Sequence, residues 1–186
     1  GMLRLSRAAD AMPHAQASDT IDRFLIHEPV AALDLASAAL FRRDDAGNYQ
    51  AQSTVGWPEP PAALAHDDPL VLDLEAQQEP LRPAEIAWEH PALAGSACPV
   101  LAIPLLLRRG LVGIALYGPH KNGADIDPEE ARALRRLALS AEASYDHLRA
   151  NELDEQVAKL KAQAAETEQL KQEVAALHQA LDAQRV

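Results

Sequence analysis

The distribution of proline divides this chain into two parts. All thirteen prolines lie at or before Pro128, and the last glycine is Gly123. Proline and glycine are the residues that most often interrupt a helix, so residues 129–186, which contain neither, favour one continuous helix. Such a helix would be about 85 Å long, which is more than a compact domain of this size needs. We therefore expect a folded domain followed by a long C-terminal helix.

The start of this helix is well marked. Asp127 is a suitable N-cap residue, and Pro128 suits the first helical position. Glu129 and Glu130 then favour the positive end of the helix dipole. Asp127 and Glu130 also have the spacing of a capping box, although that motif normally begins with serine or threonine. The sequence therefore predicts that the helix begins at Pro128.

The apolar pattern of this helix changes along its length. A stripe that includes Leu134 and Leu137 suits packing on the domain, whereas after Asn151 the spacing becomes heptad-like with one three-residue shift. A single solvated helix is the alternative, but it would expose a continuous apolar seam to water. We therefore expect a parallel homodimer. The seam residues are Leu153, Val157, Leu160, Leu170, Val174, Leu177 and Leu181.

The second constraint is the stretch ACPVLAIPLLLRRGLVGIALYGPH at residues 97–120. Two apolar runs, 100–107 and 111–117, flank Arg-Arg-Gly, and both are too short to cross a membrane as helices. They are rich in Val, Ile and Leu and show little polar alternation, so they predict an antiparallel hairpin that is buried on both faces. Pro104 has no N–H, so its nitrogen should point away from a paired strand or mark a bulge.

The first half of the chain predicts a helix and another hairpin. Residues 18–33 have a helical apolar pattern, and Pro29 should kink or divide that helix. Residues 32–43 and 49–57 read as two strands around the polar turn DDAGN. The second of these strands alternates in polarity and should be half-exposed.

The segment between the two hairpins predicts a short helix and loops. Asp68 and Pro69 repeat the pattern of an N-cap followed by a first-turn proline, whereas residues 79–99 have no regular pattern. No strand–helix–parallel-strand repeat is present, which argues against a doubly wound fold. Helices from the two ends of the domain should cover one face of the sheet, and this segment should cover the other.

This order of elements resembles a GAF domain over about residues 19–150. The most specific part is VLAIPLLLRRGLVGIALYG, which is similar to the family's two late strands, with Pro104 in the first and Gly113 early in the second. The first hairpin ends in the usual glycine-aromatic pair at Trp57. The resemblance implies an α+β fold, with a GAF-like antiparallel sheet flanked by helices and followed by a long C-terminal helix or coiled coil. The expected parts are an N-terminal segment at 1–18, a GAF-like domain at 19–150 and a coiled-coil helix at 151–186.

Several specialised versions of the family fit poorly. The cyclic-nucleotide type carries an Asn-Lys-Phe signature, whereas here Lys121 precedes Asn122 and no Phe follows. Types that attach a bilin often use a Cys followed by His, whereas Cys98 is followed by Pro99. The free methionine sulfoxide reductase type uses several cysteines, and one cysteine cannot complete an intramolecular thiol relay. No cofactor is therefore expected.

A ligand pocket is expected where residues 57–99 cover the sheet, because loops over an apolar sheet leave concavities. The lining should be mostly apolar, which favours a neutral or weakly polar ligand over a nucleotide. The two tryptophans could stack on a ligand or fill the core. The predicted lining consists of Trp57, Leu70, Leu74, Trp88 and Cys98, together with apolar residues of the late strands.

Other candidate chemistry has a simpler structural explanation. Cys98, at the entrance to a buried strand, reads more readily as a small buried hydrophobe than as a redox centre. His66, Asp67 and Asp68 could hold a metal, but helix capping explains the aspartates, so no metal site is expected. Nothing in the sequence requires catalysis.

These observations favour a non-catalytic sensory or regulatory domain that binds a small molecule and transmits a signal through a dimeric helix. The alternatives are a dimerisation module whose pocket is filled by its own side chains, and a redox enzyme centred on Cys98. The net charge of −11 argues against a nucleic-acid partner. A single cysteine and the lack of a signal peptide favour the cytoplasm. By analogy with the family, the chain could be the cytosolic part of a membrane-bound protein, with an output or membrane module elsewhere.

Overall fold

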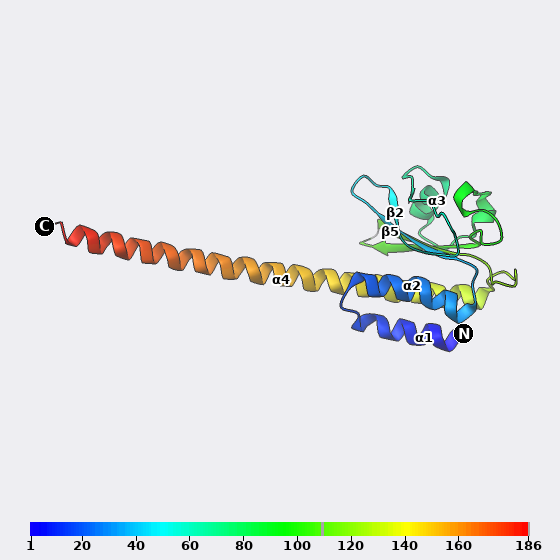
Figure 1. Ribbon diagram of the computed structural model, residues 1–186, viewed down its shortest axis with the longest axis horizontal. Coiled ribbons are helices and arrows are strands. Elements are labelled where there is room, and N and C mark those ends of the chain that lie inside the picture. The colour runs from blue at the N-terminus through cyan, green and yellow to red at the C-terminus, as the bar shows by residue number, and fades with distance from the viewer. Residues whose placement is uncertain (109, 186) are drawn as a thin grey trace. The chain divides into compact units, whose positions relative to one another are not determined.

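The computed structural model describes residues 1–108 and 110–185, so Arg109, which was expected in the late hairpin turn, lies outside the described residues. The chain divides into two compact units, Gly1–His147 and Leu148–Val186. The helices of the described residues are α1 (Met2–Ala11), α2 (Ser18–Leu33), α3 (Pro69–Gln77) and α4 (Pro128–Ala183), with short 3-10 helices η1 (Met12–His14), η2 (Pro83–Ile86) and η3 (Pro91–Leu93). The strands are β1 (Ala38–Arg43), β2 (Tyr49–Val55), β3 (Ala63–Leu64), β4 (Leu101–Leu107) and β5 (Gly110–Tyr117) (Figure 1).

The strands of the first unit form one antiparallel sheet in the order β3-β2-β1-β5-β4. The predicted late hairpin is confirmed, because β4 and β5 pair from Leu101 opposite Tyr117 to Leu107 opposite Gly110. Most residues of both strands are buried, and the residues next to the turn are partly exposed. The continuous apolar runs therefore reflect a hairpin that is covered on both faces.

Pro104 lies on β4, which is an edge strand of this sheet. Two residues earlier, the N–H and carbonyl of Ala102 bond to Leu81 rather than to β5, at 2.8 and 3.0 Å. Because backbone groups alternate along a strand with a period of two, the nitrogen of Pro104 also faces away from β5. The missing donor of this proline therefore costs the ladder nothing, as the sequence predicted.

The first predicted strand began too early. Residues 32–33 end α2, and β1 begins at Ala38. Asp34 ends the helix in a left-handed conformation with φ of 52°, and the Leu35 N–H bonds to the Val30 carbonyl. The apolar residues before Ala38 therefore belong to a helix end and its connection, a distinction that a short apolar run does not make.

Pro29 does not divide α2, which runs unbroken from Ser18 to Leu33. A proline inside a helix leaves the carbonyl four residues earlier without its usual N–H donor. That carbonyl belongs to Leu25, and the hydroxyl of Tyr117 donates to it at 2.7 Å. A tertiary hydrogen bond thus replaces the helical one, and Pro29 is tolerated.

Two layers cover the sheet of the first unit. Helices α1, α2 and the first part of α4 lie on one side, and α3 with the η2 and η3 loops lies on the other (Figure 1). Leu134 and Leu137 of α4 are fully buried, as the sequence predicted, and so are Ile21 and Leu25 of α2. Phe24, on the same helix, is only partly buried.

Helix α4 begins at Pro128, as predicted, and its start is a complete capping box. The carboxylate of Asp127 accepts from the Glu130 N–H at 2.8 Å, and the carboxylate of Glu130 accepts from the Asp127 N–H at 3.0 Å. Aspartate therefore serves here in the position that serine or threonine usually takes.

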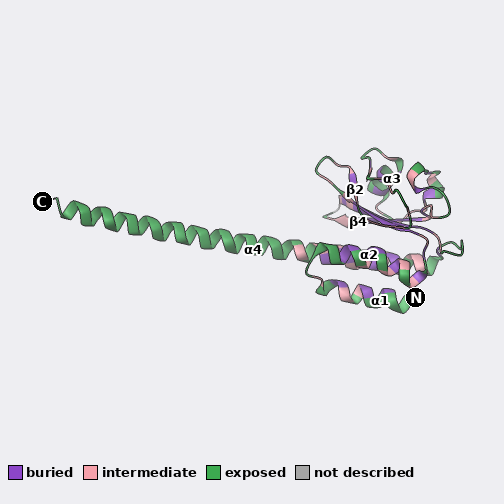
Figure 2. Cartoon of the chain, in the orientation of Figure 1, coloured by how far each residue is buried: buried purple, intermediate pink, exposed green. Residues whose placement is uncertain are grey.

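The second unit is helical up to Ala183, and every residue described from Arg149 onward is exposed (Figure 2). The seven predicted seam residues are 45–64% exposed in the single chain. None of the helices in the described part of the chain is both long enough and apolar enough to cross a membrane.

Candidate functional site

The layer that covers the sheet opposite α2 is held together at Asp68. This residue caps α3 as predicted, because its carboxylate accepts from the Leu70 N–H at 2.9 Å. The same oxygen accepts from the indole N–H of Trp88 at 2.7 Å. One carboxylate therefore fixes both the start of α3 and the loop that follows η2. Trp88 itself is only 7% exposed.

The predicted lining residues separate into a core group and a surface residue. Leu70, Leu74 and Trp88 belong to one buried cluster with residues of the sheet, and Trp57 is partly buried against that cluster. Cys98 is half-buried and lies outside the cluster. The structure therefore brings four of the five residues together as packed core.

Tyr49 on β2 belongs to the same buried cluster and is fully buried. Its hydroxyl lies 3.3 Å from both the Glu75 carboxylate on α3 and the Leu111 carbonyl oxygen on β5. Burial and the negative charge of Glu75 raise the pKa of Tyr49 to about 12. The sequence placed Tyr49 on a half-exposed strand but gave no sign that this side chain occupies the space under α3.

Two neighbouring clefts open at the surface of this layer. The first cleft has a volume of about 610 Å³ and the second about 490 Å³, both within the range of roughly 300–1,000 Å³ that small-molecule sites occupy. Glu89 and Cys98 contribute to both. The first cleft is completed by His90, Pro91, Ala94 and Gly95, and the second by Arg82, Pro83, Ala84, Ala87, Trp88, Pro99, Val100 and Asp125.

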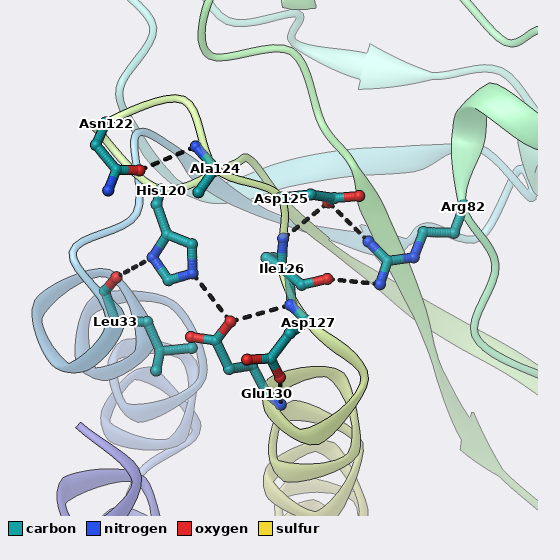
Figure 3. A network of polar contacts seen from close by, with 9 residues as sticks. All are labelled: Leu33, Arg82, His120, Asn122, Ala124, Asp125, Ile126, Asp127 and Glu130. Atoms are coloured by element: carbon teal, nitrogen blue, oxygen red, sulfur yellow. Dashed lines mark hydrogen bonds and ion pairs between the residues drawn. The ribbon is translucent and has the colours of Figure 1, made fainter.

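Arg82 connects the second cleft to the segment that leads into α4. Its guanidinium donates to the Asp125 carboxylate at 2.8 Å and to the Ile126 carbonyl oxygen at 2.7 Å (Figure 3). Asp127, the next residue, caps α4. A side chain in the wall of the cleft therefore holds the two residues that precede the α4 cap.

Comparison with known proteins identifies the fold of this chain. No protein-family model matches the sequence, and no curated protein matches it. The structure is similar to the GAF domain of a phosphoenolpyruvate-protein phosphotransferase from Coxiella burnetii, with a TM-score of 0.64, 19% identity, and coverage of 82% of this chain and 99% of that one. The fold is that of a GAF domain.

Two further structures with this GAF fold come from proteins of different kinds. One is the GAF domain of the potassium sensor histidine kinase of Escherichia coli, with a TM-score of 0.54, 16% identity, and coverage of 83% of this chain and 99% of that one. The other is the free methionine-R-sulfoxide reductase of Neisseria meningitidis in complex with its substrate, with a TM-score of 0.64, 12% identity, and coverage of 80% and 89%. At these identities the likeness establishes the GAF fold, not an activity.

The surroundings of Cys98 disfavour its thiolate form. Burial and the nearby negative charge of Glu89 raise the pKa of its thiol. Because the thiolate is the reactive form, a raised pKa slows attack on an electrophile at neutral pH. Its sulfur lies 3.9 Å from the carbonyl oxygen of Pro99.

The described residues contain no group of three or more His, Cys, Asp or Glu placed to hold a metal ion. His66 bonds to the side chain of Asn48, and Asp68 accepts from Leu70 and Trp88. His90 lines the first cleft with Cys98, and its Nδ1 accepts from the Ala92 N–H at 3.3 Å to cap η3.

Sequence reasoning missed Arg82 and Glu89, which are important residues of the clefts. Arg82 lies in a stretch without regular pattern, and its partner Asp125 is 43 residues further along the chain. No local spacing connects two such residues. A charged residue next to a first-turn proline, as in Arg82-Pro83, is too common a feature to identify a site.

Proposed function

We propose that this chain is a sensory or regulatory GAF domain that binds a small molecule in the clefts beside Cys98 and passes the bound state to α4. The observation that carries the proposal is the double role of Arg82. It forms part of the wall of the second cleft, and it holds Asp125 and Ile126 directly before the α4 cap. A ligand that displaces or reorients this guanidinium changes the hydrogen bonds at the start of α4. The GAF domain of a sensor histidine kinase is among the similar structures, which supports a sensory role.

The chemistry of the clefts favours a neutral or weakly polar ligand. Glu89 borders both clefts, so a phosphate or another anion would meet a negative charge. Arg82 is the cation of the second cleft, and Asp125 already neutralises it. Trp88, Val100 and Pro99 offer apolar surface in the same cleft. The proposal therefore places the ligand above the packed cluster rather than within it.

The proposed output is a parallel homodimer through α4. Exposure of the seven seam leucines and valines in the single chain supports it. The same alternation of four and three residues is already present before Leu153, at Leu139, Ala143, Asp146 and Ala150. Leu139 is 48% exposed although it lies in the first unit.

Charge pattern supports the parallel orientation. With Val157 at an a position, Arg149 occupies g and Asp154 occupies the following e position. In a parallel coiled coil these positions of two chains face each other, so opposite charges attract. Both residues are exposed in the single chain. We further propose a cytoplasmic location and a separate output module that responds to α4.

Packing under α3 favours a second candidate, a dimerisation module that needs no ligand. Leu70 and Leu74 are fully buried against the sheet, and Tyr49 occupies the same cluster. In this case the clefts are surface features without an occupant. A redox enzyme is not favoured, because one thiol with a raised pKa supplies neither a reactive thiolate nor a resolving partner.

A ligand-binding sensory domain and a ligand-free dimerisation module can be distinguished by substitutions that fill the clefts. The purified chain is examined by native mass spectrometry for a co-purifying molecule, and then screened by thermal shift against a library of neutral metabolites. Ala94→Trp fills the first cleft and Ala84→Trp the second, since both alanines are exposed lining residues. Ala46→Trp is the matched control at an exposed turn outside the clefts.

A ligand whose stabilising effect is lost in a cleft-filling variant and kept in Ala46→Trp supports the sensory role. If no compound raises the melting temperature and no molecule co-purifies, the dimerisation module becomes the better explanation. The same holds if a ligand binds all three variants equally, because it then binds elsewhere.

A further inference from the structure

His120 joins the two helices on one face of the sheet through both of its ring nitrogens. Nδ1 lies 2.5 Å from the carbonyl oxygen of Leu33, the last residue of α2, and Nε2 lies 2.9 Å from the carboxylate of Glu130 in the first turn of α4 (Figure 3). Both partners are acceptors. A neutral imidazole carries one N–H and donates to only one of them, whereas the imidazolium donates to both. The geometry therefore fits the protonated ring.

The helix ends around this ring favour a positive charge. Leu33 presents a carbonyl at the C-terminus of α2, where the helix dipole is negative. Glu130 supplies a full negative charge, and its carboxylate also accepts from the Asp127 N–H in the α4 capping box. The side chains of His120 and Glu130 are only 20% and 15% exposed, so water screens their attraction weakly.

The other charged groups near this ring come from three elements. From α4 and its cap come Glu130 and Asp127, both negative. Asp34, at the end of α2, pairs with Lys121, which lies between β5 and α4, at 3.3 Å. Both of these side chains are well exposed. Asp125 also lies between β5 and α4, and the guanidinium of Arg82 in the cleft wall neutralises its charge.

The net environment of the ring is therefore negative. The hydrogen bond to Glu130, together with the Leu33 carbonyl and the charges of Glu130 and Asp127, raises the pKa of His120, although burial opposes this increase. A positively charged ring is favoured under more alkaline conditions than for an ordinary histidine.

We propose that His120 is a proton-operated clamp, which holds the end of α2 to the start of α4 when protonated and releases one of them when it loses its proton. The neutral ring leaves either the Leu33 carbonyl or the Glu130 carboxylate without a donor. Loss of the Glu130 contact also removes a restraint on the carboxylate that closes the capping box, because the same oxygen accepts from the Asp127 N–H. The clamp acts on the segment that Arg82 holds from the cleft side, and this link to signalling rests on the proposed function.

The direction of the pH effect follows from the raised pKa. A histidine whose pKa is higher in the folded than in the unfolded chain stabilises the fold fully below its unfolded pKa, which is about 6.5. That contribution is lost as pH rises through the folded pKa. The clamp is therefore closed in mildly acidic solution, and it opens as the pH rises above the pKa of His120 in the folded chain.

The experiment follows the ring and α4 separately, in the full chain without ligand. Nuclear magnetic resonance titration of the His120 ring should give a pKa above the ordinary histidine value, and Glu130→Gln should lower it. Amide hydrogen exchange is then measured at Ala131, whose N–H bonds to the Asp127 carbonyl oxygen. After correction for intrinsic exchange, its rate should rise once the ring is neutral, by the factor that linkage assigns to the measured difference between the folded and unfolded pKa of His120.

His120→Gln should remove this pH dependence, whereas the exposed His178→Gln, in the second unit, should keep it. Should His120→Gln fail to fold, the titration of Glu130→Gln carries the test. A His120 pKa at or below the ordinary value, or the same pH dependence in His120→Gln as in the natural chain, overturns the clamp. Neither result depends on a ligand, so the clamp and the proposed sensory function fail independently.

Discussion

The hydroxyl of Tyr117 donates a hydrogen bond to the carbonyl oxygen of Leu25 at 2.7 Å. Leu25 precedes Pro29 by one helical turn, so its carbonyl has no N–H donor within α2. Tyr117 lies at the end of β5 and is fully buried. The strand therefore satisfies an acceptor that the proline leaves open, and it fixes α2 to the sheet at the same point.

Replacing this hydroxyl should destabilise the domain. Tyr117→Phe leaves the buried Leu25 carbonyl unpaired, and we expect a loss of about 1–3 kcal/mol in the free energy of unfolding. Pro29→Ala restores an N–H donor for that carbonyl, so Tyr117→Phe should cost less in the Pro29→Ala background. Urea denaturation of the natural protein, the two single variants and the double variant gives the coupling energy between the two positions. Equal costs in both backgrounds would contradict the compensation.

Asp68 should contribute more than an ordinary helix cap, because its oxygen also accepts from buried Trp88. We expect Asp68→Ala to lower the free energy of unfolding by about 2–4 kcal/mol, the sum of a lost cap and an unpaired buried indole N–H. Tryptophan fluorescence should change with it. Asp67→Ala, at the exposed neighbouring position, is the matched control and should leave both unchanged within about 0.5 kcal/mol. Asp68→Asn keeps an acceptor and should recover part of the loss.

The proposed seam predicts a position-dependent effect on assembly. Leu160→Glu places a charge in the apolar contact and should convert the dimer to a monomer at micromolar concentration in sedimentation experiments. Ala158→Glu lies two residues away, off the seam, and should leave the dimer intact. Both side chains are exposed in the single chain, so neither change should unfold the first unit. A natural chain that sediments as a monomer, or a dimer that persists after residues 151–186 are removed, refutes the seam.

Cys98 should react slowly with alkylating reagents at neutral pH. Burial and the charge of Glu89 raise the pKa of its thiol, so the rate of reaction with iodoacetamide should rise with pH through a midpoint above that of a free cysteine. Glu89→Gln removes the charge and should move the midpoint downward, while burial keeps it above that of the free amino acid. A midpoint below the ordinary value would instead favour a reactive, redox-active Cys98.

Local signals in the sequence located several elements correctly. The starts of α3 and α4 follow from Asp68-Pro69 and Asp127-Pro128, because a cap and a first-turn proline act within one turn of the chain. The β4–β5 hairpin follows from its uninterrupted apolar runs. These features depend on residues close together in the sequence, so these elements could be predicted without the residues that pack against them.

The candidate site was less accessible to this reasoning. Apolar lining residues were predicted from their position opposite the sheet, but the sequence does not tell whether a buried leucine faces a void or another side chain. Tyr49 and Leu70 meet in one packed cluster. Packing of this kind depends on the volumes of side chains from several elements, and no periodicity encodes it.

Sequence by itself thus determined where α2, α3 and α4 start, which strands form the late hairpin, and that α4 is a long helix. Tertiary structure alone decided that α2 continues through Pro29, that Arg82 reaches Asp125, and that His120 joins α2 to α4. The partners of Tyr117, Arg82 and His120 lie 92, 43 and 87 residues away in the chain. A cap or an apolar run acts over a few residues and is visible in their order, whereas a polar group far along the chain becomes a partner only after the sheet and helices have packed.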